Sequence, residues 1–160
     1  MTKRKFYALI VLLILLGTVF SHGFDFTLPE PPVDVTDATG LTVELLDEDT
    51  WYYGVHDVAL YLSTYGHLPE NYMTKDEARE LGWEGGSLEE YAPGMAIGGD
   101  KFGNYEGILP EAKGRQYYEC DIDTIGRDSR GAKRLVYSND GLIYYTEDHY
   151  ETFELLYGEE

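Results

Sequence analysis

The order of the hydrophobic patterns along the chain is the feature that most restricts its fold. Helical patterns come first: apolar residues recur at three- and four-residue spacing over 55–65, and Gly66 follows as a left-handed stop. Two further helices are expected to begin at capping boxes, in which Thr74 and Ser87 are each followed three residues later by Glu. Strand patterns come only after these helices. Because helices and strands do not alternate, the sequence predicts an α+β domain.

The second half of the chain contains short runs rich in Tyr, Ile, Val and Thr. These runs predict strands over 116–122, 134–138 and 142–146, and a short edge strand over 152–157. An Asn-Asp-Gly turn signal at 139–141 separates the second run from the third. Those two strands are therefore expected to form an antiparallel hairpin.

The first 50 residues differ in kind from the rest. A short basic cluster precedes an apolar run over 6–20, and small residues follow, so residues 1–23 are predicted to be a signal peptide, with a retained membrane anchor as the alternative. Residues 24–50 contain three Pro and eight acidic residues but no Lys or Arg. We expect an extended linker there, with an acidic interaction arm as the alternative. The folded domain is expected over 51–160, in a secreted, extracellular protein without stable membrane association after cleavage.

Charge and cysteine content limit the classes of function. The formal net charge is −18 at pH 7, so most of the surface should repel a polyanion. Four cations nevertheless lie within eight residues, which indicates a local anion site, with a solvated loop as the alternative: Arg127, Arg130, Lys133 and Arg134. The single cysteine, Cys120, excludes an internal disulfide and a Cys-based zinc cluster, and we expect it to be an inert core thiol. The scattered His residues lack metal-ligand spacing, so no metal or cofactor is expected.

Several motifs occur in the order in which a known family has them. They include His-Leu-Pro-Glu-Asn-Tyr-Met-Thr-Lys at 67–75, Ile-Gly-Gly-Asp at 97–100, Arg-Leu-Val-Tyr-Ser at 134–138 and Asp-His-Tyr at 148–150. With their flanking residues they resemble the barnase and binase family of bacterial guanyl-preferring ribonucleases over 55–153. The resemblance implies an α+β monomer in which N-terminal helices pack on a five-stranded antiparallel sheet.

The resemblance also implies a chemistry. Enzymes of this family cleave single-stranded RNA without a metal, because the ribose 2′-OH attacks the adjacent phosphorus and leaves a 2′,3′-cyclic phosphate. Such a step needs a base, an acid and cations for the developing phosphoryl charge. By position, Glu119 matches the general base and His149 the general acid. Arg130 and Arg134 match the phosphate-binding arginines, and Lys75 matches the active-site lysine.

Base recognition is implied for the loop after Asp100. Glu106 matches the glutamate that accepts from guanine, and Tyr150 matches the aromatic residue that stacks on the base. Two positions depart from the barnase pattern: Gly103 replaces Ser, and Tyr105 replaces Arg, which removes one cation from the substrate face. The implied substrate-binding residues are Phe102, Gly103, Asn104, Tyr105, Glu106 and Tyr150.

Two functions remain open at this point. A ribonuclease is favoured because the matching acid, base and arginines are all present. The alternative is a catalytically weak or inactive binding module of the same fold that engages a protein partner. The resemblance further implies single-stranded RNA as substrate and a small acidic inhibitor of the barstar type as a partner.

Overall fold

The computed structural model describes residues 35–36, 42–43 and 46–159. The predicted signal peptide and most of the predicted linker lie outside these residues. Two short strands precede the main domain, β1 (Val35–Thr36) and β2 (Thr42–Val43), and they pair with each other antiparallel. Among the described residues, no helix combines the length and the apolar character that a membrane crossing requires.

Helix α2 (Val55–Tyr65) forms where the apolar periodicity predicts it. Its inward face buries four side chains at helical spacing: Val58, Ala59, Tyr61 and Leu62. Gly66 ends the helix with φ of 75°, and its N–H donates to the Leu62 carbonyl at 2.9 Å. Glycine adopts this left-handed backbone without the steric cost of a Cβ, so the predicted stop is confirmed.

Helix α3 (Lys75–Glu80) begins at the predicted capping box. The Thr74 hydroxyl accepts from the Glu77 backbone N–H at 3.3 Å, and the Glu77 carboxylate accepts from the Thr74 N–H at 3.0 Å. Two backbone donors at the helix start are thereby satisfied, which fixes the first turn and the direction in which Lys75 leaves it.

The third expected helix does not form, and residues 87–94 make a series of turns instead. The Ser87 hydroxyl accepts from the backbone N–H of Glu89 at 3.2 Å, so it closes a tight local turn and not a capping box. Pro93 follows within a few residues and disfavours helical backbone before it. Too few residues remain to offset the cost of nucleating a helix.

The described residues contain a six-stranded sheet in the order β3-β4-β5-β6-β7-β8. The five strands from β4 onward pair antiparallel, whereas β3 pairs parallel with β4, so the sheet is mixed and not the purely antiparallel five-stranded sheet that was expected. The bounds are β3 (Tyr72–Met73), β4 (Ala96–Phe102), β5 (Tyr117–Asp121), β6 (Arg134–Ser138), β7 (Ile143–Thr146) and β8 (Glu154–Tyr157). The three strands and the edge strand expected from composition are confirmed.

Strand β4 has no strand-like composition because it contains two adjacent glycines. A Cβ at Gly98 would lie 2.6 Å from the Cβ of Cys120 and 2.7 Å from the Tyr72 ring. The glycine therefore permits β3 and β5 to approach β4 closely. This requirement comes from neighbouring strands, and local sequence patterns do not reveal it.

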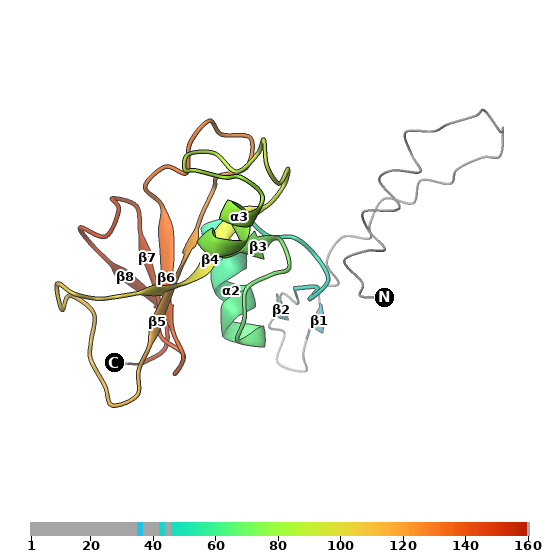
Figure 1. Cartoon of the computed structure of the whole chain (residues 1–160). Coiled ribbons are helices and arrows are strands. Elements are labelled where there is room, and N and C mark those ends of the chain that lie inside the picture. Colours follow the sequence, from blue (N-terminus) through green and yellow to red (C-terminus); the bar gives the residue numbers. More distant parts are fainter. Residues whose placement is uncertain (1–34, 37–41, 44–45, 160) are drawn as a thin grey trace, which may run out of the picture. The chain divides into compact units, whose positions relative to one another are not determined.

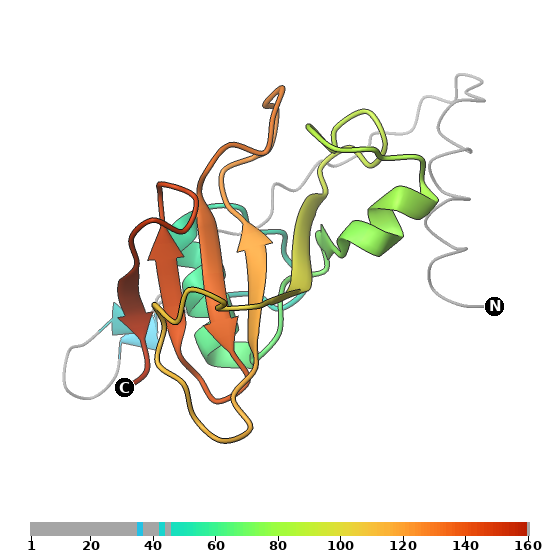
Figure 2. The same cartoon turned by 60° about the vertical axis from the view of Figure 1, so that its left-hand side comes forward.

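The sheet separates two apolar clusters, and α2 lies along one of its faces (Figures 1 and 2). On one face, α2 packs against alternate side chains of the strands, which include Cys120, Leu135 and Ile143. Cys120 is 1% exposed, so its expected place in the core is confirmed, and burial raises the pKa of its thiol, as expected of an unreactive cysteine. The other face carries a second cluster that includes Tyr117 and Val136. Glu119 lies two residues after Tyr117 on β5 and therefore shares this second face.

The residues just before the expected domain start are packed against α2. Leu46 is buried, and its carbonyl accepts a hydrogen bond from the Tyr65 hydroxyl at 2.6 Å. The Glu48 carbonyl accepts from the Tyr61 hydroxyl at 3.0 Å. These contacts tie residues 46–50 to the helix.

Candidate active site

Strand register brings the charged residues of the site together on one face of the sheet. Asp121 ends β5 and pairs in register with Arg134, the first residue of β6. Glu119 lies two positions earlier on β5 and pairs with Asp100 of β4. Side chains two apart on a strand point the same way, so both carboxylates of β5 face the same side.

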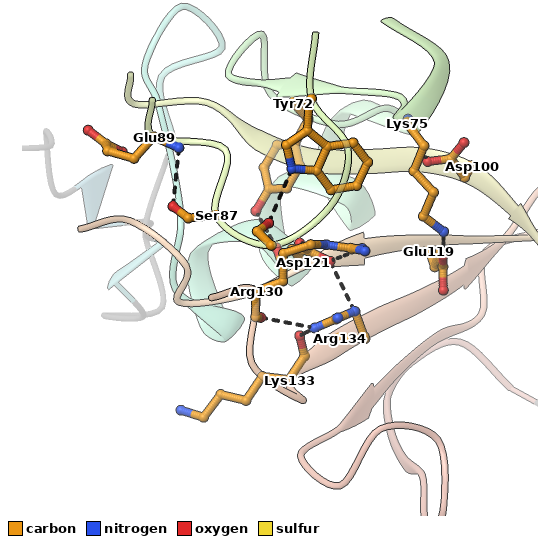
Figure 3. Close-up of polar contacts among 12 residues, drawn as sticks. Tyr72, Lys75, Ser87, Glu89, Asp100, Glu119, Asp121, Arg130, Lys133 and Arg134 are labelled. Atoms are coloured by element: carbon orange, nitrogen blue, oxygen red, sulfur yellow. Dashed lines mark hydrogen bonds and ion pairs between the residues drawn. The ribbon is translucent and has the colours of Figure 1, made fainter. Parts of the chain in front are cut away.

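Glu119 is held by two donors from distant parts of the chain. Lys75 Nζ forms an ion pair with Oε1 from the start of α3, and the Tyr150 hydroxyl donates to Oε2. Glu119 as a whole residue is 7% exposed, and Figure 3 shows the Lys75 side chain extending toward it. Burial alone would raise its pKa, but the bonds from Lys75 and Tyr150 and the charge of Arg130 outweigh that effect. The pKa of Glu119 is therefore lower than usual, and the group is ionised near neutral pH.

Lys75 is itself positioned by α3 and β4. Its backbone N–H donates to Asp100 Oδ2 at 3.0 Å, which ties the helix start to the strand that pairs with β5. The capping box fixes the same turn from the other side. The backbone of Lys75 is therefore fixed on both sides, and its ammonium group extends from this position to Glu119.

Asp121 pairs with both candidate phosphate-binding arginines. It is 1% exposed and accepts from Arg130 Nε at 2.6 Å and from Arg130 Nη2 at 2.8 Å. Arg134 Nε lies 2.9 Å from Asp121 Oδ1, close enough for an ion pair, although its N–H is not aligned for a hydrogen bond. Figure 3 shows the two guanidinium groups converging on this carboxylate. A single buried anion thus sets the positions of two cations.

Each arginine has a second support. Arg134 is 3% exposed, and its Nη1 donates to the Lys133 carbonyl at 2.7 Å. Arg130 lies over the ring of Trp83, 5.7 Å from the ring centroid. An Arg face stacked on an aromatic ring retains its in-plane N–H donors for anions.

The four-cation cluster divides into two pairs in the folded chain. Arg130 and Arg134 form ion pairs with Asp121, whereas Lys133 forms an ion pair with Asp123 at 2.7 Å. Arg127 donates to the Asp123 carbonyl at 3.1 Å. Only the first pair adjoins Glu119, so the sequence cluster is not one continuous anion site.

His149 lies in a strained turn after β7. His149 has φ of 60° and Tyr150 has φ of 75°, a left-handed backbone that costs about 1 kcal/mol or more at a non-glycine residue. Hydrogen bonds hold this turn: Thr146 Oγ1 accepts from the Tyr150 N–H at 3.0 Å and donates to Asp148 Oδ1 at 2.8 Å. His149 is exposed, and its ring centroid lies 4.6 Å from that of Tyr150. The turn thus presents His149 beside the tyrosine that bonds to Glu119.

The expected base-binding loop follows β4. Phe102 packs against Tyr150 with ring centroids 5.2 Å apart, which joins the loop to the site. The Asn104 side chain closes the loop by accepting from the Leu109 N–H at 3.0 Å and donating to the Leu109 carbonyl at 2.9 Å. Glu106 is exposed, so its carboxylate is accessible to the hydrogen-bonding edge of a base.

Five of the expected residues form one cluster: Lys75, Glu119, Arg130, Arg134 and Tyr150. Lys75 and Tyr150 bond to Glu119 directly, and the two arginines share Asp121 and lie close enough for the charge of Arg130 to lower the pKa of Glu119. Sequence reasoning missed Asp121, Asp100 and Trp83. Asp121 had a signal, because it lies two residues after Glu119 in a predicted strand. Trp83 and Asp100 had none, since their roles depend on how α3 and the following turns fold back on β4.

The cluster combines an ionised carboxylate with three cations, and the solvent-accessible imidazole of His149 lies beside its Tyr150. Such a group can accept one proton, donate another and bind an anion between the two. The aromatic residues and the loop beside it offer a surface for a planar ring. This combination of α+β fold and site defines a class of enzymes that act on phosphodiesters of nucleic acids.

The comparisons with known proteins agree with that class. The ribonuclease family matches residues 55–157. A ribonuclease from Heyndrickxia coagulans is 55% identical over 98 residues, which cover 60% of this chain and 89% of that protein. A ribonuclease from Bacillus pumilus is 43% identical over 152 residues, which cover 92% of this chain and 91% of the relative. The guanyl-specific ribonuclease St of Saccharopolyspora erythraea is 47% identical over 57 residues, or 36% of this chain and 56% of that protein. The chain belongs to the barnase-like ribonuclease family.

Proposed function

We propose that this ribonuclease is a secreted endonuclease that cuts single-stranded RNA, preferentially after guanosine, and leaves a 2′,3′-cyclic phosphate without a metal ion. The observation that carries the proposal is the buried, ionised Glu119 placed among Lys75, Arg130 and Arg134. A base and the cations for a phosphoryl group are thereby supplied by protein side chains alone.

In the proposed reaction the ribose 2′-oxygen forms a bond to phosphorus as the bond from phosphorus to the 5′-oxygen breaks. Glu119 takes the proton of the 2′-OH, and His149 gives a proton to the departing 5′-oxygen. Both oxygens of Glu119 already accept a bond, from Lys75 and Tyr150, but each carboxylate oxygen has two lone-pair sites. The carboxylate can therefore accept the 2′-OH without first losing its donors.

Negative charge grows on the phosphoryl oxygens as the reaction proceeds. Arg134 and Arg130 are always charged and are held by Asp121 before substrate arrives, so little reorganisation accompanies the reaction. Asp121 partly offsets the charge of the two arginines. Their contribution to binding the phosphoryl group therefore depends on where their N–H donors are placed more than on the sum of their charges.

Guanosine preference rests on the loop that follows Phe102. The loop is closed on itself by Asn104, and it presents backbone groups and Glu106 to a base edge. Reading a base on its pairing edge requires an unpaired base, which agrees with a single-stranded substrate. Two relatives named guanyl-specific ribonucleases match this chain over a shorter stretch, and their specificity supports the same preference.

The test is cleavage of a guanosine-containing dinucleotide, followed by chromatographic detection of the cyclic phosphate. We expect Glu119→Ala and His149→Ala each to lower kcat/KM by about 10²- to 10⁴-fold, the range for losing one general acid or base. Glu111→Ala and His67→Ala, which alter exposed residues outside the cluster, serve as matched controls. Wild-type turnover in either of the first two variants would contradict the assigned roles, and loss of turnover in a chelator would contradict metal independence.

Two further parts of the proposal concern the cell. Export with cleavage near residue 23 predicts that the protein in the culture medium lacks the apolar segment, which mass spectrometry of its N-terminus would show. A producing cell would then need to protect its own RNA, and a small barstar-like inhibitor of the monomeric enzyme fits that need.

A further inference from the structure

Tyr105 is the most exposed large hydrophobic residue in the described domain. Its side chain is 95% exposed, and it belongs to the loop that follows Phe102. Full exposure of a tyrosine ring on an otherwise ordered loop leaves its apolar faces in water. An aromatic face in that state is available to a planar ligand.

The Tyr105 ring lies over Gly103, two residues earlier in the loop. A Cβ added at Gly103 would lie 2.2–2.8 Å from three atoms of the Tyr105 ring. Gly103 does not have the left-handed backbone that would by itself favour glycine. Gly103 thus leaves space that the Tyr105 ring occupies, and a side chain there would displace the ring from this position.

The loop that carries Tyr105 is fixed and lies next to the proposed catalytic cluster. Asn104 is bonded to Leu109 through both side-chain atoms, and the Gly107 N–H donates to the Asn104 carbonyl at 3.0 Å. Phe102, three residues before Tyr105, packs on Tyr150, whose hydroxyl donates to Glu119. The loop thus carries the Tyr105 ring beside the proposed catalytic cluster.

Charge gives an independent reason for an aromatic contact. From residue 51 onward the chain has nine Lys and Arg against 22 Asp and Glu, so long-range forces oppose the approach of RNA. Base stacking is uncharged, and every base offers a π-face. An acidic ribonuclease can therefore gain affinity for RNA from stacking where a basic enzyme gains it from phosphate contacts.

We propose that Tyr105, held over Gly103, stacks on the base of a nucleotide adjacent to the guanosine in the loop and so forms a second base-binding site. The inference rests on the proposed ribonuclease function and adds a preference for substrates longer than one nucleoside. It makes Tyr105 a specificity-determining residue for substrate length.

The experiment compares two substrates for each variant. The first is guanosine 3′-(methyl phosphate), which has the scissile bond but no second base. The second is the tetranucleotide UpGpUpU, together with forms in which the base on the 5′ side or the bases on the 3′ side are replaced by abasic ribose. The measured quantity is the ratio of kcat/KM for the tetranucleotide to kcat/KM for the methyl ester.

Tyr105→Ala is expected to lower this ratio by roughly 5- to 150-fold, the range for removing one base–aromatic stack. Tyr105→Phe should keep the ratio within about twofold, because a phenyl ring also stacks. Gly103→Ala should lower it as well, since the new Cβ displaces the Tyr105 ring. Ile108→Ala, which alters another exposed apolar residue of the loop, is the matched control and should leave the ratio unchanged.

Further readouts separate stacking from other roles. Abasic ribose on one side should remove the Tyr105→Ala effect and so identify the stacked base. The salt dependence of kcat/KM should be the same in Tyr105→Ala as in wild type, because no charge is lost. An equal fall for both substrates would mean that Tyr105 only shapes the loop, and no fall would mean that it makes no contact; either result overturns this inference alone. A wild-type protein that cleaves neither substrate would instead overturn the proposed function.

Discussion

The substitution Asp121→Asn would measure how much of the stability of the domain depends on one buried anion. The substitution keeps the size of the side chain but removes its charge. Asp121 is 1% exposed, and its two basic partners, Arg134 and Arg130, have side chains 3% and 21% exposed. The variant would leave two largely buried guanidinium groups without their counterion.

The structure allows the cost to be worked out. Removing one partner of a buried ion pair costs about 3–5 kcal/mol, because the remaining charge stays desolvated and unpaired. Arg130 is partly exposed and can regain water, so we expect the cost to stay in that range and not to double. Since a domain of this kind is stable by about 5–15 kcal/mol, Asp121→Asn should remove a large share of the free energy of unfolding.

Urea denaturation measures this loss, and the chain provides a matched control. Asp123 lies two residues further on and pairs with Lys133, with side chains 35% and 45% exposed. Asp123→Asn should therefore cost about 0–1 kcal/mol, as exposed ion pairs do. If Asp121→Asn is as stable as the control variant, with an unchanged denaturant slope, then Asp121 does not hold the arginines as argued.

Three further predictions follow from the same contacts. Lys75→Met should move the acid limb of kcat/KM to higher pH in a pH–rate profile, because the pKa of Glu119 rises when the lysine's hydrogen bond and charge are lost; an unmoved limb would contradict the pairing. Hydrogen bonds from Thr152 lower the pKa of Asp148 to about 2 from 3.8, so its stabilising contribution is complete above about pH 4 and is lost as the pH falls toward 2. In Asp148→Asn, the free energy of unfolding should accordingly fall less steeply than in wild type as the pH is lowered from about 5 to 2. Thermal unfolding over this pH range measures the fall, and a fall as steep as that of wild type would contradict the reasoning. Leu46→Ala should lower the free energy of unfolding by about 2 kcal/mol, the low end of the range for a buried leucine. Leu155→Ala, at an exposed position, should change it by less than about 0.5 kcal/mol. Equal effects of the two variants in urea denaturation would show that the segment before the domain is not packed as described.

Local sequence patterns were sufficient for the elements that are stabilised locally. The apolar spacing of α2, its glycine stop and the capping box at Thr74 act within a few residues, and all three are present in the structure. The capping box expected at Ser87 shows the limit of the same reasoning. Its local signal was outweighed by the nearby proline and by the shortness of the segment.

The resemblance of motifs selected the residues of the site but not their mutual contacts. It pointed to Glu119 and Tyr150, yet the bond between them joins β5 to a turn 31 residues away. It also left Asp121 unassigned, although this carboxylate positions both arginines. Such contacts depend on strand register, which brings distant residues opposite each other.

The sequence by itself determined the α+β class, most of the secondary structure and the chemical types available for catalysis. It also determined the net charge of −18, which suggests a protein that avoids nucleic acid. Only the tertiary structure decided where charge acts, because pairing β5 with β6 sets Asp121 beside Arg134, and α3 brings Lys75 to Glu119. The physical reason is that charges interact strongly over a few ångströms in a buried site, whereas net charge averages over the whole solvated surface.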